Sequence, residues 1–398
     1  MDLNYSAEDE AFRLEVRSFL ENKFPKDIGE RAKAGIRFKK DDYYRWHKAL
    51  NEQGWVAPHW PTEHGGTNWT PVQSNIFDEE CFAAGTPRQL PFGTRLVGPV
   101  IIHFGNDAQK ERYLPTIRSG EEFWCQGFSE PGAGSDLASL KTRAVLEGDE
   151  WVVNGQKTWT TTAQYADWIF CLVRTNTDVK KQAGISFLLI DMKTPGISVR
   201  PILTIDGDVQ INEVFLEDVR VPKENLVGEV DKGWTYAKFL LGNERTGIAG
   251  VGLCKNDLEN LKTIARSERK NGKLLIEDPL FQARLSRAEI DLTALELTNM
   301  RMLFDIGDEG TPGAIASVLK IRGSELQQRF AELQMEATGS YALPWQQGAL
   351  EPDWNGKAVG PAYAAARSPL YYDRRKTTIY GGSTEVQKNI ITKAILEL

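Results

Sequence analysis

CQGFSEPGAGSD, the stretch from Cys125 to Asp136, is the most informative part of this sequence because it suits neither a helix nor a strand. It holds three glycines, a proline and two serines, which together predict a loop of fixed shape. Glycines permit positive φ angles and let a ligand approach the backbone closely, while Ser129 and Ser135 supply hydroxyls beside bare N–H groups. Such a loop can hold a phosphate or the polar edge of a ring. A plain glycine-rich surface turn is the alternative.

A second motif, GQKTWTTTAQYADWIF, runs from Gly155 to Phe170. It places Trp159 among threonines on a run with strand character, where a solvent-facing strand seldom carries a tryptophan. An indole ring can stack on a planar cofactor while neighbouring threonines hydrogen-bond the cofactor's edge. The two motifs together favour a cofactor site over a surface turn.

Length and charge limit the classes of protein that this chain can be. Its 398 residues exceed what one hydrophobic core usually supports, so two or three domains are expected. A net charge of −7 argues against a nucleic-acid binder, although it leaves room for a local basic pocket. No apolar run is long enough to span a bilayer, and the first residues are acidic rather than signal-like. We therefore expect a cytoplasmic protein without a membrane partner.

Cysteine and histidine usage predicts no metal site. The four cysteines are widely spaced and form no CxxC pair, which also makes a disulfide framework unexpected. The four histidines are scattered as well, and His59 and His64 lie on either side of a proline in a loop. No metal is expected.

The first part of the chain has the apolar spacing of helices. Ser6 with Asp9 predicts a helix start, as does Thr70 with Pro71. Tryptophans in the loop before Pro71 are expected to pin that loop to the domain rather than to contact a substrate. Residues 1–122 are predicted to form an α-helical domain. Its expected helices cover 7–23, 41–53, 71–84, 93–104 and 107–119.

From about residue 123 the pattern alternates, as in strands. Turn signals stand at GDE and at Asn154 with Gly155, between runs of β-branched and aromatic residues. Residues 123–232 are therefore predicted to form a small β-barrel or a pair of packed sheets. Further strands are expected in DWIFCLVRT, GISFLLIDM, GISVRPI and INEVFLEDV.

Helical spacing returns after Gly233, over 234–266, 279–305, 312–338 and 374–396. This number of long helices predicts a four-helix bundle over residues 233–398 and, for the whole chain, an α+β fold. A connection rich in Gly, Pro and Trp occupies residues 340–378, and so long a loop is usually functional or an interface.

Four motifs in this order resemble the acyl-CoA dehydrogenase family across the whole chain: SEPGAGSD, GQKTWTT, LGNERTGIAG and IYGGSTEVQ. The resemblance implies an N-terminal α-helical domain, a middle β domain that binds FAD and a C-terminal four-helix bundle. It also implies an oxidoreductase of lipid metabolism. The family's reaction removes a proton from Cα and a hydride from Cβ of an acyl-CoA, leaving a trans-2-enoyl-CoA, with electrons passing to an electron-transfer flavoprotein.

The resemblance also implies which residues hold FAD. A neighbouring subunit completes the adenine half of the site in this family, through positions that match Arg269 and Gln334. Ser383, Thr384 and Glu385 match the segment that closes over the cofactor. The implied contacts on the middle domain are Gln126, Phe128 and Ser129 at the flavin's polar edge, Gly134 and Ser135 near the pyrophosphate, and Trp159 and Thr161 against the ring.

The catalytic base departs from the common family pattern. Many members carry their glutamate in a segment like IYEGT, where this sequence has Gly381. A minority place it on a bundle helix just before an arginine, and Glu244 with Arg245 matches that arrangement. The resemblance thus implies Glu244 as the base and the Gly381 N–H as a donor to the thioester carbonyl. Ser135, Arg245 and Gly382 are the implied substrate-binding residues.

Three stretches and the long 340–378 connection are most similar to the α subunits of bacterial steroid or bulky-acyl dehydrogenases. The stretches are APHWPTEHGG, TWTTTAQYADWIFCLVRT and LLGNERTG. Those assemble as α2β2 heterotetramers with a paralogous subunit, and a homo-oligomer is the plain alternative. Two rival functions remain open at this point. One is an acyl-CoA oxidase that uses O2, and the other is a non-catalytic assembly subunit of a heteromer.

Overall fold

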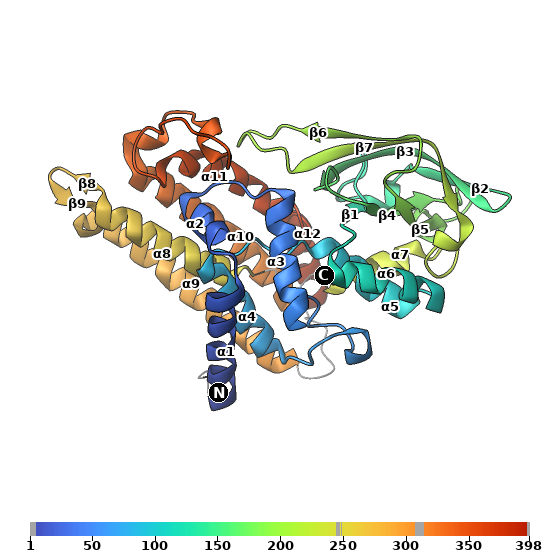
Figure 1. Ribbon diagram of the computed structural model, residues 1–398, viewed down its shortest axis with the longest axis horizontal. Coiled ribbons are helices and arrows are strands. Elements are labelled where there is room, and N and C mark those ends of the chain that lie inside the picture. Colours follow the sequence, from blue (N-terminus) through green and yellow to red (C-terminus); the bar gives the residue numbers. More distant parts are fainter. Residues whose placement is uncertain (1–4, 244–246, 248, 307–313, 396–398) are drawn as a thin grey trace.

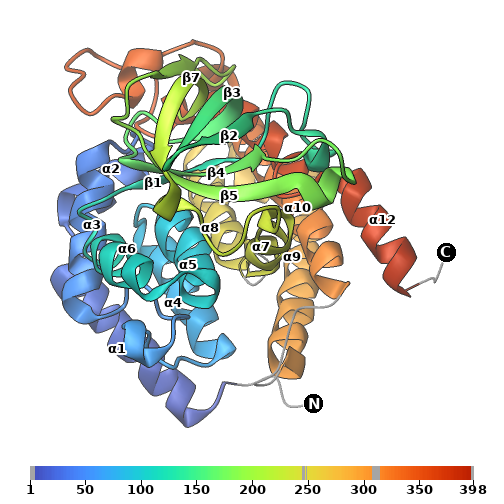
Figure 2. The same cartoon turned by 90° about the vertical axis from the view of Figure 1, so that its right-hand side faces the viewer.

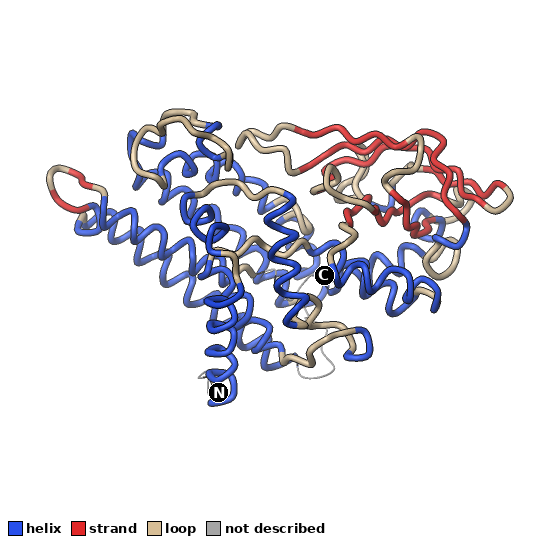
Figure 3. The backbone as a smooth tube through the Cα atoms, in the orientation of Figure 1, coloured by secondary structure: helices blue, strands red, loops and turns tan. Residues whose placement is uncertain are grey.

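The computed structural model describes residues 5–243, 247, 249–306 and 314–395. In Figure 1 the first helices lie in the middle, a β sheet lies at one end, and the long helices of the C-terminal half extend toward the other. Figure 3 shows the strands gathered at that one end, apart from a small hairpin at the opposite extremity. The chain is thus an α+β protein with helical N- and C-terminal parts and a β middle part, as the sequence predicts.

Local capping signals begin the N-terminal helices where the sequence predicts them. Ser6 and Asp9 exchange side-chain to backbone hydrogen bonds at the start of α1, and Thr70 with Gln73 does the same at α4. A short helix, α2, was not predicted from the sequence. The helices are α1 (Ala7–Lys23), α2 (Lys26–Ala34), α3 (Lys40–Gln53), α4 (Pro71–Ala84), α5 (Gly98–Phe104), which continues a π-helical segment at Phe92–Val97, and α6 (Asp107–Ser119).

The tryptophans of the loop before α4 pack into the domain, as predicted. Trp55 is buried against Phe19 and Trp69, with ring centroids 4.8 Å and 5.3 Å away. The indole N–H of Trp60 donates to the Thr94 carbonyl oxygen at 2.6 Å. These contacts fix the loop to the helices on either side of it.

One curled sheet forms the middle part. Strands β4 and β5 are buried on both faces, which explains their nearly continuous apolar sequence. One face of β4 and β5 joins the core shared with the helices, and the other joins a second core within the sheet. Figure 2 shows α5, α6 and α7 beneath β4 and β5. The strands are β1 (Trp124–Gly127), β2 (Arg143–Glu147), β3 (Glu150–Thr161), β4 (Trp168–Arg174), β5 (Ile185–Asp191), β6 (Ile197–Ile202) and β7 (Ile211–Pro222), in the order β1-β4-β2-β3-β7-β6 with β5 paired to β4.

The C-terminal part is a helical bundle in which α10 packs against α8, α9 and α12. A short hairpin of β8 (Arg269–Lys270) and β9 (Lys273–Leu274) follows α8. The helices are α7 (Gly233–Asn243), α8 (Val251–Ser267), α9 (Pro279–Ile306), α10 (Ile315–Thr338), α11 (Arg367–Arg374) and α12 (Thr384–Ile395).

Two predicted helices are wrong in extent, and glycines explain both. The helix predicted over 234–266 is two helices, because Gly250 takes φ +63° directly before α8. The helix predicted over 374–396 starts only at Thr384, because Gly381 and Gly382 take φ +64° and +84°. An α-helix cannot continue through these left-handed backbone angles.

The long connection before α12 crosses the other two parts of the chain. Glu351 forms ion pairs with Arg37 at 3.0 Å and with Lys39. Gln347 donates from its side-chain amide to the Gly207 carbonyl oxygen at 2.9 Å, in the loop between β6 and β7. The connection therefore contacts the segment between α2 and α3 and the β6–β7 loop of the same chain.

No helix of the described residues is both long enough and apolar enough to cross a bilayer. The four cysteines are buried with free thiols, and burial raises the pKa of each thiol.

Candidate active site

The glycine-rich loop follows β1 and is open on one side. The backbones of Glu130 and Ala133 hydrogen-bond to each other in both directions at 3.0 Å, which closes a tight turn. A Cβ added at Gly127 would lie 2.7 Å from Ile169 Cδ1, so close packing favours glycine there. A Cβ at Gly132 or Gly134 would meet no atom of the residues that the structure describes within 4 Å. These two glycines leave space for a ligand to approach the backbone.

The loop is held to β3 through its carbonyl groups. Thr158 N–H donates to the Ser129 carbonyl oxygen at 2.9 Å, and Lys157 Nζ donates to the Phe128 carbonyl oxygen at 3.3 Å. In a trans peptide the C=O and the following N–H point in opposite directions, so the Ser129 N–H points away from Lys157. No described residue accepts a hydrogen bond from that N–H. It is a donor available to a polar group on the open side of the loop.

Trp159 occupies a β-bulge in β3. The pairing of β3 with β7 is irregular between Lys157 and Thr160, and Trp159 has φ +58°. Its side chain is 60% exposed, while Thr158 and Thr160 beside it are buried. A bulky residue rarely adopts such an angle, and bulges frequently redirect side chains next to functional sites. The bulge presents the indole outward, next to the strand residues that anchor the loop.

The other predicted contacts on the middle part lie on the same two segments. Gln126 and Thr161 are half-buried at the ends of β1 and β3, Phe128 is buried, and Ser135 is exposed in the loop. Phe128 packs edge-on against the ring of Phe170, with centroids 5.7 Å apart. The fold thus brings the glycine loop and the Trp159 motif together.

The Gly381 segment forms the N-terminus of α12. Ser383 Oγ accepts from Val386 N–H at 3.4 Å, as a helix cap does. A hydrogen bond from the Glu385 backbone and one from Ser383 outweigh the slight effect of burial, so the pKa of the exposed Glu385 lies below its usual value. Thr384 Oγ1 donates to the Thr378 carbonyl oxygen at 3.4 Å.

The two glycines of that segment differ in the space around them. A Cβ at Gly382 would lie 2.4 Å from Gln387 Nε2, whereas one at Gly381 would meet no atom of the described residues within 4 Å. No hydrogen bond from the Gly381 N–H to another described residue is present. Its N–H is therefore available as a donor.

Two predicted FAD contacts lie away from the loop. Arg269 is exposed in the hairpin that projects at the far end of α8 and α9 in Figure 1, and its Nη1 donates to the Gly272 carbonyl oxygen at 3.0 Å. Gln334 is fully buried on α10, where it donates to the Asp257 carbonyl oxygen at 2.8 Å and accepts from Arg367. Within this chain neither residue contacts the glycine loop.

The predicted base Glu244 and its neighbour Arg245 lie outside the described residues. Among the residues that are described, no group of three or more His, Cys, Asp or Glu side chains could hold a metal ion.

The sequence did not predict a buried ion pair beneath the loop. Lys157 is 0% exposed and its Nζ lies 2.8 Å from Glu130 Oε1. Burial opposes ionisation of Glu130, but Lys157 and hydrogen bonds from Thr142 and Lys141 outweigh it, so the pKa of Glu130 lies below its usual value. The only sign of this pair in the sequence was an acid, Glu130, in the first motif and a lysine, Lys157, in the second.

Comparisons with known proteins cover the whole chain. Sequence models described as "Acyl-CoA dehydrogenase" match with their N-terminal domain at residues 6–121, their middle domain at 125–219 and their C-terminal domain at 231–396. The chain is 35% identical to "Acyl-CoA dehydrogenase IpdE1" of Mycobacterium tuberculosis over 397 residues, covering 98% of this chain and 97% of that one. It is 28% identical to the mouse mitochondrial long-chain specific acyl-CoA dehydrogenase, over 98% of this chain and 87% of that one.

Solved structures agree. The ChsE4-ChsE5 complex from Mycobacterium tuberculosis contains a chain with a TM-score of 0.86 and 32% identity, over 100% of this chain and 99% of that one. The structure described as "Tcur3481-Tcur3483 steroid ACAD" gives a TM-score of 0.86 and 30% identity over the same shares.

Proposed function

The chain belongs to the acyl-CoA dehydrogenase family and is an oxidoreductase, and on this basis we propose that it uses FAD to convert an acyl-CoA into a trans-2-enoyl-CoA. The observation that carries the proposal is the outward-facing Trp159 beside the loop of Ser129. The residues present fit a flavin, because they offer an indole face, an outward N–H and open space at Gly132 and Gly134 for a pyrophosphate. When bound, FAD supplies the acceptor for the hydride that leaves Cβ.

The polar edge of the flavin is assigned to Gln126, Phe128 and Ser129, because these residues lie on β1 and at the start of the loop beside Trp159. Hydrogen bonds at that edge stabilise negative charge as it develops on a ring. The pyrophosphate is assigned to Gly134 and Ser135, which are exposed on the open side of the loop.

Proton removal is assigned to Glu244, from its position just before Arg245 and from the missing side chain at Gly381. The Gly381 N–H, which donates to no other residue in the described part of the chain, supports a second role, that of donor to the thioester carbonyl, which makes the α proton more acidic. Arg245, Ser135 and Gly382 are assigned to the acyl-CoA.

We place the substrate among steroid side-chain or other bulky or long acyl-CoA thioesters, and the electron acceptor is an electron-transfer flavoprotein. Support for the steroid substrate comes from the structure described as a steroid ACAD, whose chain matches the whole of this one.

Assembly into a homo-oligomer, or into an α2β2 heterotetramer with a paralogous subunit, is part of the proposal. The projecting hairpin of Arg269 supports it, because that arginine lies away from the loop of its own chain. Exposed apolar side chains support it as well, such as Leu343 at 83% and Ile205 at 74% exposed.

The test is anaerobic addition of acyl-CoA thioesters to the purified protein, alone and co-expressed with its paralogue. We expect a yellow protein whose visible absorption bleaches with bulky acyl-CoA substrates and returns when an electron-transfer flavoprotein is added. Rapid recovery with O2 alone would indicate an oxidase instead. A colourless protein that takes up no FAD in either preparation would indicate an assembly subunit and overturn the proposal.

A further inference from the structure

A lysine lies buried at the base of the glycine loop with every N–H donor used. Lys157 Nζ donates to Glu130 Oε1 and to the Leu172 carbonyl oxygen, both at 2.8 Å, and to the Phe128 carbonyl oxygen at 3.3 Å. The side chain is 0% exposed. Lysine is almost never fully buried unless it is paired, because its charge loses hydration. The site is therefore a closed polar link between the loop after β1 and the strands β3 and β4.

Glu130 extends this link to the other end of the loop. Its carboxylate accepts from Lys141 N–H at 2.6 Å and from Thr142 N–H at 2.8 Å, directly before β2 begins. The same carboxylate accepts from Lys157. The ion pair thus ties together the beginning of the loop, its end and the strand that carries the tryptophan.

The direction of the Phe128 carbonyl has a consequence for the open side. Because that carbonyl turns inward to Lys157, the Ser129 N–H on the same peptide turns outward. One residue further along β3 from Lys157, Thr158 N–H holds the Ser129 carbonyl, and Trp159 follows. Replacing Lys157 or Glu130 is therefore expected to move both the outward Ser129 N–H and the β-bulge that presents the Trp159 indole.

We propose that Lys157 and Glu130 are positioning residues that set the geometry of the flavin site through Phe128, Ser129 and Trp159. The inference rests on the proposed function, because it assumes that FAD binds on the open side of the loop. Neither residue is assigned a contact with the substrate. A purely structural role would lower stability alone, whereas a positioning role also changes the bound flavin.

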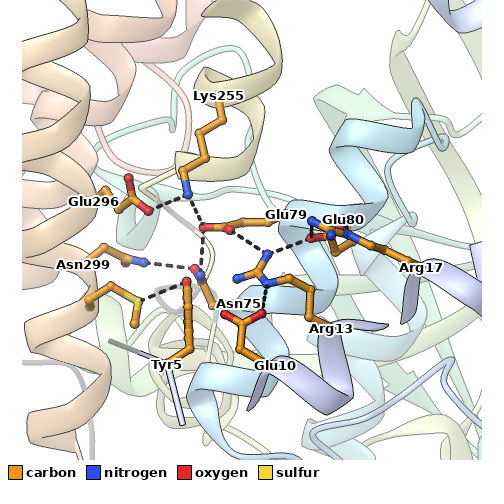
Figure 4. A network of polar contacts seen from close by, with 11 residues as sticks. Tyr5, Glu10, Arg13, Arg17, Asn75, Glu79, Glu80, Lys255, Glu296 and Asn299 are labelled. Carbon is orange, nitrogen blue, oxygen red and sulfur yellow. Dashed lines mark hydrogen bonds and ion pairs between the residues drawn. The ribbon is translucent and has the colours of Figure 1, made fainter. Parts of the chain in front are cut away.

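The experiment compares Lys157→Met and Glu130→Gln with Lys255→Met. Lys255 is the control for loss of a bridging lysine elsewhere, since it also pairs with carboxylates, Glu79 at 3.0 Å and Glu296, but does so between α4, α8 and α9 (Figure 4) and is 35% exposed. For each protein we measure FAD affinity, the visible spectrum and midpoint potential of the bound flavin, and amide hydrogen exchange of residues 128–142 without cofactor. Lys157→Arg keeps the charge and tests for rescue.

We expect FAD affinity to fall at least tenfold in Lys157→Met and Glu130→Gln, with a shifted spectrum and potential and faster exchange at Lys141 and Thr142. Lys157→Arg should recover part of the affinity, and Lys255→Met should match wild type in all flavin readouts. Should Lys157→Met fail to fold, the nearly isosteric Glu130→Gln decides. Normal flavin properties in folded variants, or equal losses in Lys255→Met, overturn this inference alone. Failure of the wild-type protein to bind FAD overturns the proposed function and this inference together.

Discussion

Thr158 N–H donates to the Ser129 carbonyl oxygen at 2.9 Å, and this bond joins the two motifs that the sequence separates by a hairpin. It fixes the loop at the position where β3 bulges and turns Trp159 into solvent. A backbone bond of this kind does not depend on side-chain identity. The backbone at Trp159 and the backbone of the loop therefore keep their spacing when the side chain of Ser129 or Trp159 is replaced. The effect of such a replacement can be ascribed to the side chain itself.

Trp159→Ala should weaken FAD binding and shift the visible spectrum of the bound flavin, because the indole that we place against one face of the flavin ring is removed. The expected loss is about 1 kcal/mol, or roughly a fivefold rise in Kd. Titration of the apoprotein with FAD measures it. Trp354→Ala is the control, since Trp354 is also exposed, at 40%, but lies on the connection before α12. An unchanged spectrum and Kd in Trp159→Ala would contradict the placement.

Arg269→Ala should lower FAD content and the oligomer fraction together, because Arg269 projects from its own chain on the hairpin of β8 and β9. Within the described residues its side chain holds only the Gly272 carbonyl, so the fold of the subunit should persist. Light scattering combined with the flavin to protein absorbance ratio measures both quantities. Lys273→Ala, on the facing strand, is the matched control. A monomer that retains full FAD would refute the prediction.

Periodicity was sufficient to predict the three parts of the chain. Apolar spacing changes from helical to alternating near residue 123 and back after Gly233, and the structure follows these changes. Capping residues such as Ser6 and Thr70 predicted helix starts well because caps are local interactions. The breaks at Gly250 and Gly381 were not predicted, since a glycine within a helical pattern is often tolerated.

The candidate site was predictable in part. Glycines, hydroxyls and Trp159 could be identified because they stand together in short motifs. The burial of Lys157 could not, because lysine is normally exposed and its partner Glu130 comes from a different segment. The φ angle of Trp159 was equally hidden, since a bulge depends on the pairing of β3 with β7.

Glu80→Gln should destabilise the protein at neutral pH and reduce its sensitivity to acid. Glu80 on α4 bonds Arg13 at 2.7 Å and Arg17 at 2.8 Å, both on α1 (Figure 4). Burial alone would raise the pKa of Glu80, but both arginines lower it below its usual value of 4.5. Because the unfolded chain then binds a proton more readily, this stabilisation is complete above about pH 4.5 and is lost as the pH falls through the folded pKa.

The expected loss of unfolding free energy in Glu80→Gln at pH 7 is about 1–2 kcal/mol, because glutamine lacks the carboxylate charge that pairs with the two guanidinium groups and its NH2 group cannot accept a hydrogen bond from them. The midpoints of urea unfolding at pH 7 and at pH 3.5 measure the loss of stability and how it depends on pH. These two pH values lie roughly on either side of the usual pKa of a glutamate side chain. Glu21→Gln, exposed on α1, is the control. If stability depends on pH in the same way in wild type and in Glu80→Gln, the contacts of Glu80 with Arg13 and Arg17 do not set that dependence.

Glu244→Gln should slow substrate-dependent bleaching of the flavin at least a hundredfold, since general-base catalysis contributes roughly two to four orders of magnitude. The substitution keeps the side-chain shape, so FAD and acyl-CoA should still bind. Stopped-flow absorbance under anaerobic conditions measures the rate, and equilibrium titration checks binding.

Gly381→Glu in the Glu244→Gln background should restore part of the bleaching rate if residues 244 and 381 face the same Cα of the acyl-CoA. A Cβ built at Gly381 meets no atom of the described residues within 4 Å, so the first atom of the new side chain causes no clash with them. Gly381 has φ +64°, however, so a glutamate costs roughly 1–2 kcal/mol of backbone strain and recovery should be incomplete. Gly381→Ala in the same background carries the same strain without a carboxylate and should recover nothing. A near-normal rate in Glu244→Gln alone would place the base on another residue or on a partner chain.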